Sequence, residues 1–223
     1  MEKHIVKIES IDKVTHDVLK IVTEKPKKYA FSPGQATEIS INKYAWRDKK
    51  KPFTFTCLPV DNYLEFTIKT YPSHKGVTNE LLYLKKSDDL ILHEVFGAIS
   101  YKGEGTFIAG GAGVTPFISI FRHLESENKI GNNKLIFANK AKNDIILEDE
   151  FQKLLGSNFI NILSDEKVDG YANGQITKDF IQANCGGTNK LFYLCGPPPM
   201  MEAIEKQLAD LHVDEKSIVK EAF

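Results

Sequence analysis

The hydrophobic pattern of this chain changes once, near Tyr101–Glu104, and this change constrains the fold more than any other feature of the sequence. From residue 4 to about residue 100 the pattern is mostly of period two, with β-branched and aromatic residues in segments such as HIVKIESI, ATEISIN and YLEFTIKTY. Turn-forming pairs such as Pro33-Gly34 and Pro72-Ser73 separate these segments. The first half therefore predicts a small antiparallel barrel or sandwich, with one short helix after Gly76.

The second half alternates short apolar segments with segments of helical spacing. The strand-like segments are GTFIAGG, KLIFANK, NFINILSDE and KLFYLCG, and SIVKEAF is a short final strand. The helical segments are residues 115–124, ILEDEFQKLLG, ITKDFIQAN and PPPMMEAIEKQLADLH. Alternating β and α units indicate a parallel sheet with helices on both faces. We therefore predict two domains, residues 1–102 and residues 103–223.

Composition excludes several classes of protein. The 223 residues are 42% hydrophobic and 26% charged, which excludes a disordered chain, a fibrous repeat and a disulfide-built miniprotein. No window of about 18 apolar residues exists, and the first ten residues have no apolar signal core, so we expect no membrane segment. The odd set Cys57, Cys185 and Cys195 has no iron–sulfur or zinc spacing, so we expect no metal centre and a reducing, cytoplasmic compartment.

The formal net charge of −1 argues against a nucleic-acid binder, which is usually far more basic. The charge is unevenly divided, because residues 1–103 hold 17 basic and 13 acidic side chains, whereas residues 104–223 hold 12 basic and 17 acidic ones. Two interpretations fit this division. It reflects ordinary solvated faces, or the first domain offers a docking face to an acidic partner.

Two glycine-containing turns follow apolar strands in the second half. Residues 110–116, GGAGVTP, open a helix, where free N–H groups and the helix dipole favour a pyrophosphate. Pro116 stands where the usual dinucleotide fingerprint has its third glycine, and it suits a first helical turn. Residues 195–201, CGPPPMM, also lie where a strand ends and a helix begins. Each turn alone also fits a strand–helix connection without a ligand, but the pair favours a nucleotide site.

Two further segments in the first half have the residue types of phosphate contacts. Residues 51–56, KPFTFT, combine a cation, an aromatic ring and a hydroxyl on one strand, and residues 76–81, GVTNEL, begin a helix at a glycine. Taken singly, each also fits a plain strand or a helix cap.

Together and in this order, the four segments resemble the ferredoxin–NADP⁺ reductase superfamily. The resemblance extends over essentially the whole chain and is closest to the compact members that lack a fused iron–sulfur or haem domain. It implies an FAD-binding antiparallel β-barrel followed by an α/β pyridine-nucleotide domain.

The resemblance assigns a role to each matching residue. The family's Arg-x-Tyr-Ser segment falls on Lys51, Pro52, Phe53 and Thr54, so that the cation would meet the FAD pyrophosphate, the ring would lie on the flavin and the hydroxyl would face flavin N5. Lys51 replaces arginine and cannot make a bidentate phosphate contact, and Phe53 lacks the tyrosine hydroxyl.

The remaining motifs are carried over in the same way. The second flavin-phosphate motif falls on Gly76, Val77 and Thr78, the nucleotide pyrophosphate turn on Gly111, Ala112, Gly113, Thr115 and Pro116, and the site beside the nicotinamide on Cys195, Gly196 and Pro197. The chain ends in Glu221, Ala222 and Phe223, which match the family's Glu-x-aromatic ending close to the flavin. Phe223 would then cover the flavin until nicotinamide displaces it, unless it is only a frayed tail.

The resemblance implies an FAD-dependent NAD(P)H oxidoreductase. Hydride would pass from nicotinamide C4 to flavin N5, and electrons would leave singly to an acceptor such as ferredoxin, flavodoxin or an oxygenase component. Thr54 would tune N5, Cys195 would shape the nicotinamide site rather than act as a nucleophile, and Glu221 would complete the catalytic set. A cytochrome and a small quinone or dye remain open as acceptors. An FAD-containing electron-transfer or regulatory subunit, and a nucleotide-binding protein without turnover, are the alternatives.

The donor is predicted from the segment that follows NFINIL. Ser164 and Asp165 stand where NADP-specific relatives usually have a Ser-Arg pair for the 2′-phosphate. Asp165 would repel that phosphate and accept a hydrogen bond from a ribose hydroxyl, and residues 137–147 resemble NADH-using cytochrome b5 reductases. Lys140 and Lys142 could instead attract a 2′-phosphate, and Asp165 also fits a solvated loop. We favour NADH over NADPH.

Overall fold

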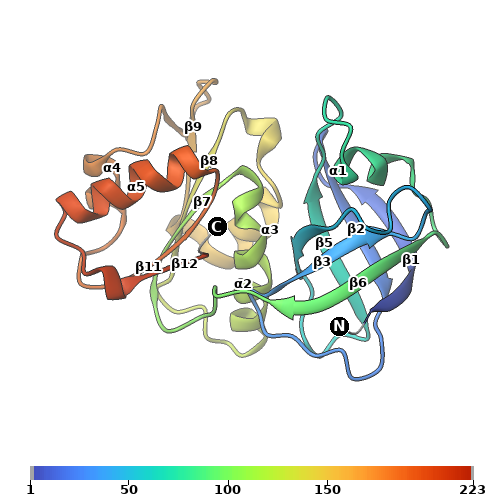
Figure 1. Cartoon of the computed structure of the whole chain (residues 1–223). Helices are drawn as coiled ribbons and strands as arrows, with labels where there is room; N and C mark the ends of the chain where they lie inside the picture. The colour runs from blue at the N-terminus through green and yellow to red at the C-terminus, as the bar shows by residue number, and fades with distance from the viewer. Residues whose placement is uncertain (1–2, 222–223) are drawn as a thin grey trace.

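The computed structural model describes residues 3–221 and contains two six-stranded sheets joined by a single linker (Figure 1). All pairs in the first sheet are antiparallel, and all pairs in the second are parallel. The two-domain fold predicted from the sequence is therefore confirmed. The linker is residues 97–104, and the predicted boundary between residues 102 and 103 falls inside it.

The first sheet closes into a barrel. Its strands follow the order β4-β3-β6-β1-β2-β5. They are β1 (His4–Lys13), β2 (Val18–Glu24), β3 (Ala36–Ile41), β4 (Lys51–Thr54), β5 (Tyr63–Lys69) and β6 (Asp89–Phe96). The two ends of this order meet just after β4, where Phe55 bridges Phe66 and the Thr56 N–H donates to the Glu65 carbonyl at 2.8 Å. Phe55 and Phe66 are fully buried at the centre of the barrel core.

One short helix covers an end of the barrel, as the sequence predicts. It is α1 (Val77–Glu80), which begins directly after Gly76. Val77 and the following Leu81 are buried and belong to the barrel core, so the helix start is fixed by packing.

The second sheet follows the order β10-β9-β8-β7-β11-β12. Its strands are β7 (Gly105–Gly110), β8 (Lys134–Asn139), β9 (Phe159–Leu163), β10 (Ala172–Asn173), β11 (Leu191–Cys195) and β12 (Ile218–Lys220). The chain moves outward from β7 through β8 and β9, and then returns to the other side of β7 as β11. The β7–β11 pair is therefore the topological switch point, where open α/β sheets bind their ligands at the carboxyl ends of the strands.

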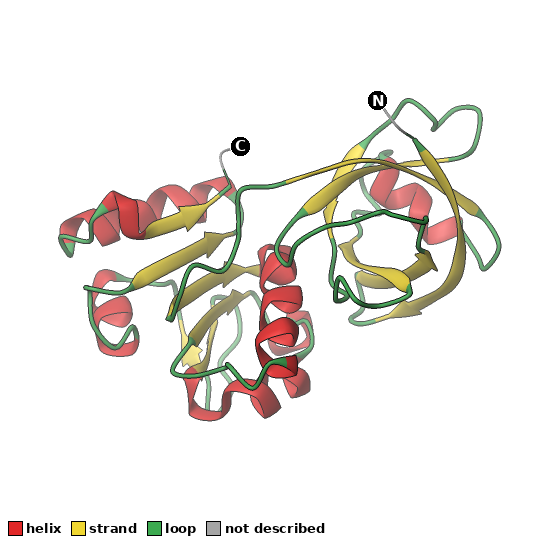
Figure 2. Cartoon of the chain, turned by 90° about the horizontal axis from the view of Figure 1, so that it is seen from below, coloured by secondary structure: helices red, strands yellow, loops and turns green. Residues whose placement is uncertain are grey.

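Helices cover both faces of this sheet, again as predicted (Figures 1 and 2). The α-helices are α2 (Thr115–Ser126), α3 (Glu148–Leu155), α4 (Lys178–Asn184) and α5 (Pro198–Asp210). The 3-10 turns are Leu81–Tyr83, Gly111–Val114, Lys142–Asp144, Gly156–Asn158 and Glu215–Ser217. Alternate strand residues separate the two faces, since Phe107 packs with α2 and α3, whereas Ile108 packs with α4 and α5.

The two domains share buried apolar contacts. Helix α2 lies between the parallel sheet and the barrel in both views (Figures 1 and 2). Val18 of the barrel and Ile99 of the linker are each 1% exposed and belong to the same core cluster as Phe117 and Phe121 of α2. Because of this shared core, the positions of the two domains are coupled. Within residues 3–221, none of the helices has both the length and the apolar composition needed to cross a membrane.

Candidate functional site

The predicted nucleotide residues gather at one edge of the parallel sheet. The carboxyl ends of β11, β7, β8 and β9 are neighbours in that order, as the pairs Cys195–Ala109, Gly110–Ala138 and Asn139–Leu163 establish. Neighbouring strands lie about 4.8 Å apart, so the four strand ends span roughly 14 Å. Cys195, the turn after Gly110, and the Ser164-Asp165 pair after β9 therefore lie in one row that suits an extended dinucleotide.

Glycines bring two of these loops into backbone contact. A Cβ atom on Gly113 would lie 2.2 Å from the Cys195 carbonyl oxygen, and one on Gly110 would lie 2.3 Å from the Met200 sulfur. Gly111 is different, because its φ is +50° and a Cβ there would meet nothing within 4 Å. Gly113 is thus required by a close backbone contact, Gly110 lies against the flexible Met200 side chain, and Gly111 leaves open backbone at the surface of the turn.

The start of α2 is available to a phosphate. Pro116 is buried in the first turn of α2, and no side chain caps this helix. The Thr115 hydroxyl donates to the Ala112 carbonyl at 3.0 Å, and its oxygen lies 3.4 Å from the Thr54 hydroxyl. The pyrophosphate turn and the predicted flavin strand therefore touch through two threonines.

The Lys51–Thr54 segment is β4 itself. Lys51 and Pro52 are exposed, Phe53 is half-buried and packs against the barrel core, and Thr54 is half-buried beside Thr115. Thr54 reaches the second domain through its hydrogen bond with Thr115. The roles of Thr54 and Phe53 toward the flavin stay predictions.

The second flavin motif has the open backbone that a phosphate requires. A Cβ on Gly76 would meet nothing within 4 Å, and no side chain caps the start of α1. Val77 is buried and Thr78 is half-buried. The Lys43–Glu80 ion pair, at 3.0 Å, joins the loop before β4 to α1. Residues of both motifs fit an FAD phosphate group.

The surroundings of Cys195, which include the Glu221 carboxylate, suppress the reactivity of its thiol. Burial, with a smaller effect of the Glu221 charge, raises the pKa of Cys195 to about 12. The thiol therefore stays protonated at neutral pH, in agreement with a shaping role rather than a nucleophilic one. The Glu221 carboxylate accepts hydrogen bonds from the backbone of Ala98 at 2.9 Å and Ile99 at 3.4 Å. It thereby joins β12 to the linker, while Ala222 and Phe223 lie outside the described residues.

Asp165 is exposed at the end of the row of strands. Its N–H donates to the Lys140 carbonyl at 2.9 Å, and its carboxylate accepts from the Ser164 hydroxyl at 2.6 Å. The exposed Lys142 ammonium lies 5.2 Å from the centre of the Tyr171 ring. Next to this loop, the buried Asn139 amide has no hydrogen-bond partner on either polar atom among residues 3–221, which fits a position beside a polar ligand.

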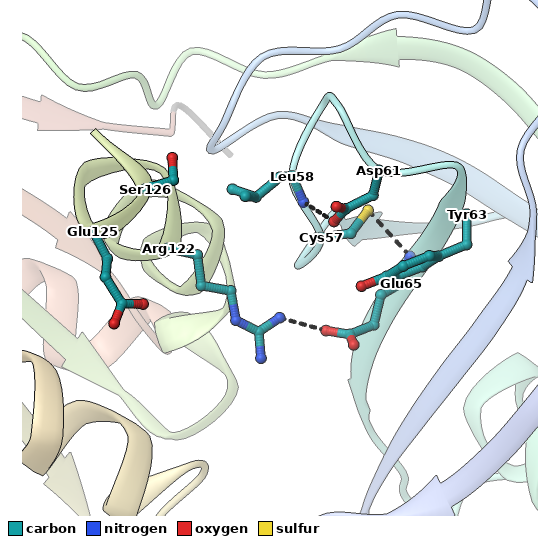
Figure 3. Close-up of a pocket in the computed structure, with 8 residues that line it drawn as sticks. All are labelled: Cys57, Leu58, Asp61, Tyr63, Glu65, Arg122, Glu125 and Ser126. Atoms are coloured by element: carbon teal, nitrogen blue, oxygen red, sulfur yellow. Dashed lines mark hydrogen bonds and ion pairs between the residues drawn. The ribbon is translucent and has the colours of Figure 1, made fainter. Parts of the chain in front are cut away.

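Sequence reasoning missed Arg122 of α2. Its guanidinium contacts Glu150 of α3 and the Thr56 carbonyl of the barrel. It also reaches Glu65 of the barrel, as Figure 3 shows. These contacts outweigh the effect of burial and raise its pKa above the usual value. Arg122 and Glu65 also line an interdomain pocket of about 360 Å³ with Cys57, Leu58, Asp61, Tyr63, Glu125 and Ser126. The residues around an arginine on an amphipathic helix do not indicate that it will contact carboxylates of another helix and another domain.

Two family models match the chain in series. Residues 3–110 match an FAD-binding domain, and residues 107–206 match an oxidoreductase NAD-binding domain. The order of these domains agrees with the barrel followed by the parallel sheet. The chain therefore belongs to the ferredoxin–NADP⁺ reductase superfamily.

Individual proteins resemble the chain over most of its length. The reductase component of propane 2-monooxygenase from Mycolicibacterium smegmatis is 27% identical over 216 residues, covering 88% of this chain and 60% of that protein. NADH-cytochrome b5 reductase 2 from Mycosarcoma maydis is 27% identical over 221 residues, covering 88% and 62%. The chain thus spans about 60% of the length of these curated relatives.

A solved structure supports the fold independently. A ferredoxin NADP⁺ reductase from Neisseria gonorrhoeae, solved with bound FAD and NADP, superposes with a TM-score of 0.81 at 16% identity. The match covers 99% of this chain and 98% of that one. At this identity the likeness establishes the fold alone.

Proposed function

We propose that the chain is an FAD-dependent NAD(P)H oxidoreductase that takes a hydride from the nicotinamide and delivers electrons singly to an acceptor. The observation that carries this proposal is the contact between Thr54 of β4 and Thr115 of α2. It joins the residue predicted to face the flavin to the turn predicted to bind the nucleotide, at the switch point of the sheet.

Each group of residues has a positioning task in this proposal. Lys51 and the Gly76–Thr78 turn would hold the FAD phosphates, and the Gly111–Pro116 turn would hold the nucleotide pyrophosphate. Cys195 and Gly196 would form the wall beside the nicotinamide. When bound, the flavin supplies the chemistry, accepting a two-electron hydride and releasing electrons one at a time. The protein supplies proximity and orientation, for which no general acid or base is needed.

The first test is the binding and reduction of FAD. Protein produced with ample flavin should be yellow, and NADH should bleach it in the absence of oxygen. Protein that stays colourless and binds no FAD in titration would overturn the proposal. Bound FAD that neither NADH nor NADPH reduces would reject the oxidoreductase function but retain the flavin site.

We propose NADH as the preferred donor. The carboxylate of Asp165 is exposed at the sheet edge, where it would repel a 2′-phosphate. A relative named for NADH, the cytochrome b5 reductase from Mycosarcoma maydis, supports the same choice. The test compares kcat/KM for both donors in the wild type and in Asp165→Arg. The variant should shift the ratio toward NADPH, whereas a wild type that prefers NADPH and an unchanged ratio in the variant would refute the assignment.

We propose that the acceptor is an acidic carrier protein or oxygenase component. The relative from Mycolicibacterium smegmatis is the reductase component of a monooxygenase, which supports an acceptor of this class. The basic loop before β4 would steer it, through Arg47, Lys49 and Lys50. Lys50 is paired with Glu38 at 3.0 Å, and Lys49 lies 4.2 Å from the Trp46 ring, so Arg47 is the natural first site to mutate. Reduction of an acidic carrier should slow with salt and in Arg47→Gln, and insensitivity to both would contradict steering.

We also propose a reducing, cytoplasmic compartment. All three cysteines are free thiols, and Cys57 and Cys185 are buried. Burial raises the pKa of Cys57 to about 11, so this thiol resists oxidation. Alkylation of freshly isolated, denatured protein should modify every cysteine, and a disulfide found in that material would contradict the proposal.

A further inference from the structure

Helix α2 contacts the flavin-side strand segment at two places. At its first residue, the Thr115 hydroxyl lies 3.4 Å from the Thr54 hydroxyl. Two turns later, Arg122 Nη1 donates to the Thr56 carbonyl at 2.7 Å. Thr54 and Thr56 are separated only by Phe55, whose ring is buried in the barrel core. One helix of the nucleotide domain is therefore held against a short and rigid stretch of the FAD domain.

Arg122 makes the strongest polar part of this contact. Its Nε and Nη2 donate to the two oxygens of Glu150 at 2.6 Å and 2.8 Å, and its Nη1 donates to Glu65 Oε1 at 2.6 Å. Glu65 is only 7% exposed, and the same carboxylate oxygen accepts from the Thr56 hydroxyl at 2.8 Å. Figure 3 shows the guanidinium pointing from α2 toward Glu65 on β5. A planar fork with three occupied nitrogens fixes direction as well as distance.

Other polar contacts between the domains are longer, including the 2.9 Å hydrogen bond from the Ala98 N–H in the linker to Glu221. The Gly34 N–H donates to the Ser119 hydroxyl at 3.3 Å, and His16 lies 3.7 Å from Asp144 at an exposed site. The Arg122–Glu65 contact combines a shorter distance with opposite charges, and both side chains are largely buried. It is thus the contact best suited to fix the orientation of one domain relative to the other.

We propose that Arg122 is a positioning residue for hydride transfer, which holds α2 against the flavin-side strand through Glu65 and the Thr56 carbonyl. The inference rests on the proposed oxidoreductase function. Its physical basis is that α2 begins at the nucleotide turn, so a shift of α2 relative to the barrel moves the nicotinamide relative to the flavin. A displacement of about 1 Å away from the reactive geometry can cost about 100-fold in rate.

The two carboxylate partners of Arg122 provide a matched pair of variants. Glu65→Gln weakens the contact between domains, whereas Glu150→Gln weakens a contact within the nucleotide domain and leaves the contacts to Glu65 and Thr56. We would mix the FAD-loaded protein anaerobically with saturating NADH and follow flavin bleaching. Glu65→Gln and Arg122→Lys should slow the hydride step by about 10- to 100-fold, while Glu150→Gln should stay close to the wild type. The long-wavelength band of a nicotinamide stacked on a flavin should weaken in the same two variants.

A second readout needs no flavin. In the apoprotein, hydrogen exchange at the Gly34 amide reports on the interface, because that amide bonds to Ser119 of α2. Exchange there should accelerate in Glu65→Gln and Arg122→Lys, but not in Glu150→Gln, and the amides of β7 should be unaffected in all three. If Arg122→Lys does not fold, the comparison of the two glutamine variants carries the test.

The possible results separate the inference from the proposed function. Equal effects of Glu65→Gln and Glu150→Gln on the hydride step, or no effect of either, would overturn the positioning role, even if both lower the melting temperature. A wild type that NADH and NADPH fail to reduce would reject the proposed function. In that case the exchange measurement still decides whether Arg122 couples the two domains.

Discussion

Substitution of Gly113 by alanine should disturb the nucleotide site by moving the loop after β11. The added Cβ would lie 2.2 Å from the Cys195 carbonyl oxygen, 2.5 Å from its carbon and 2.7 Å from the Gly196 Cα. These are backbone atoms, so no side chain can rotate away. Since ordinary contact distances are about 3.5 Å, the two loops must separate by roughly 1 Å. Overpacking of this kind costs about 1–3 kcal/mol of folding free energy.

The larger effect of Gly113→Ala is expected on the rate of hydride transfer. A separation of about 1 Å between the pyrophosphate turn and the loop beside the nicotinamide corresponds to a loss of up to about 100-fold. The assay is anaerobic rapid mixing of the FAD-loaded variant with saturating NADH, together with urea unfolding. FAD content should be unchanged, because the flavin motifs belong to the other domain.

Gly105→Ala is the matched control for this prediction. A Cβ on Gly105 would lie 2.3 Å from the Leu191 carbonyl oxygen, so it presses the amino ends of β7 and β11 apart by a similar amount. Its position is the amino end of β7, at the sheet edge opposite to the predicted site. Both variants should lose similar stability, but only Gly113→Ala should lose most of the hydride rate. Equal rates in the two variants would refute the reasoning.

Three further predictions concern other parts of the chain. Burial, assisted by the Lys50 charge, lowers the pKa of His93, so the neutral form is favoured in the folded state. The free energy of unfolding should therefore fall as the pH drops below about 6.5. Urea unfolding at pH 8 and pH 5 should show a smaller loss of this free energy in His93→Gln than in the wild type. Lys51→Ala should weaken FAD binding about tenfold, while Lys51→Arg should tighten it, as measured by flavin titration; equal affinities would remove Lys51 from the phosphate site. Deletion of Phe223 should alter the flavin spectrum and the half-saturating NADH concentration, and an identical spectrum and kinetics would reduce it to a tail.

The sequence contained enough information to predict the architecture. In the barrel, apolar and polar residues alternate because each strand buries one face. After Gly105, short apolar strands buried on both faces alternate with helices that bury one face. Both patterns are visible within short segments of the sequence. The glycine turns were predictable for a similar reason, because a turn that brings backbones close has few residue choices. The strand β10 was missed, because its two residues, Ala172 and Asn173, are too few to show a period.

The contacts between the domains were not predictable in this way. Arg122 and Glu65 are 57 residues apart, and Glu221 and Ala98 are 123 residues apart. Each of these side chains is also ordinary in its own segment, since Arg122 ends an apolar stretch of a helix and Glu65 stands in an alternating strand. Their pairing depends on the packing of α2 against the barrel, which no single segment encodes. The sequence therefore predicts candidate loops for the chemistry, but not the contacts that hold those loops in position relative to one another.

The geometry of the proposed site depends on the interface between the two domains. The flavin and nucleotide motifs are on separate domains, so their relative position depends on the interface and not on either motif. Thr115 and Arg122 lie on the same face of α2, two helical turns apart, and contact residues on either side of Phe55. A rotation of α2 about either contact would break the other one. The two contacts together constrain the distance and the angle between the domains, which is the condition that the proposed hydride transfer imposes on its two rings.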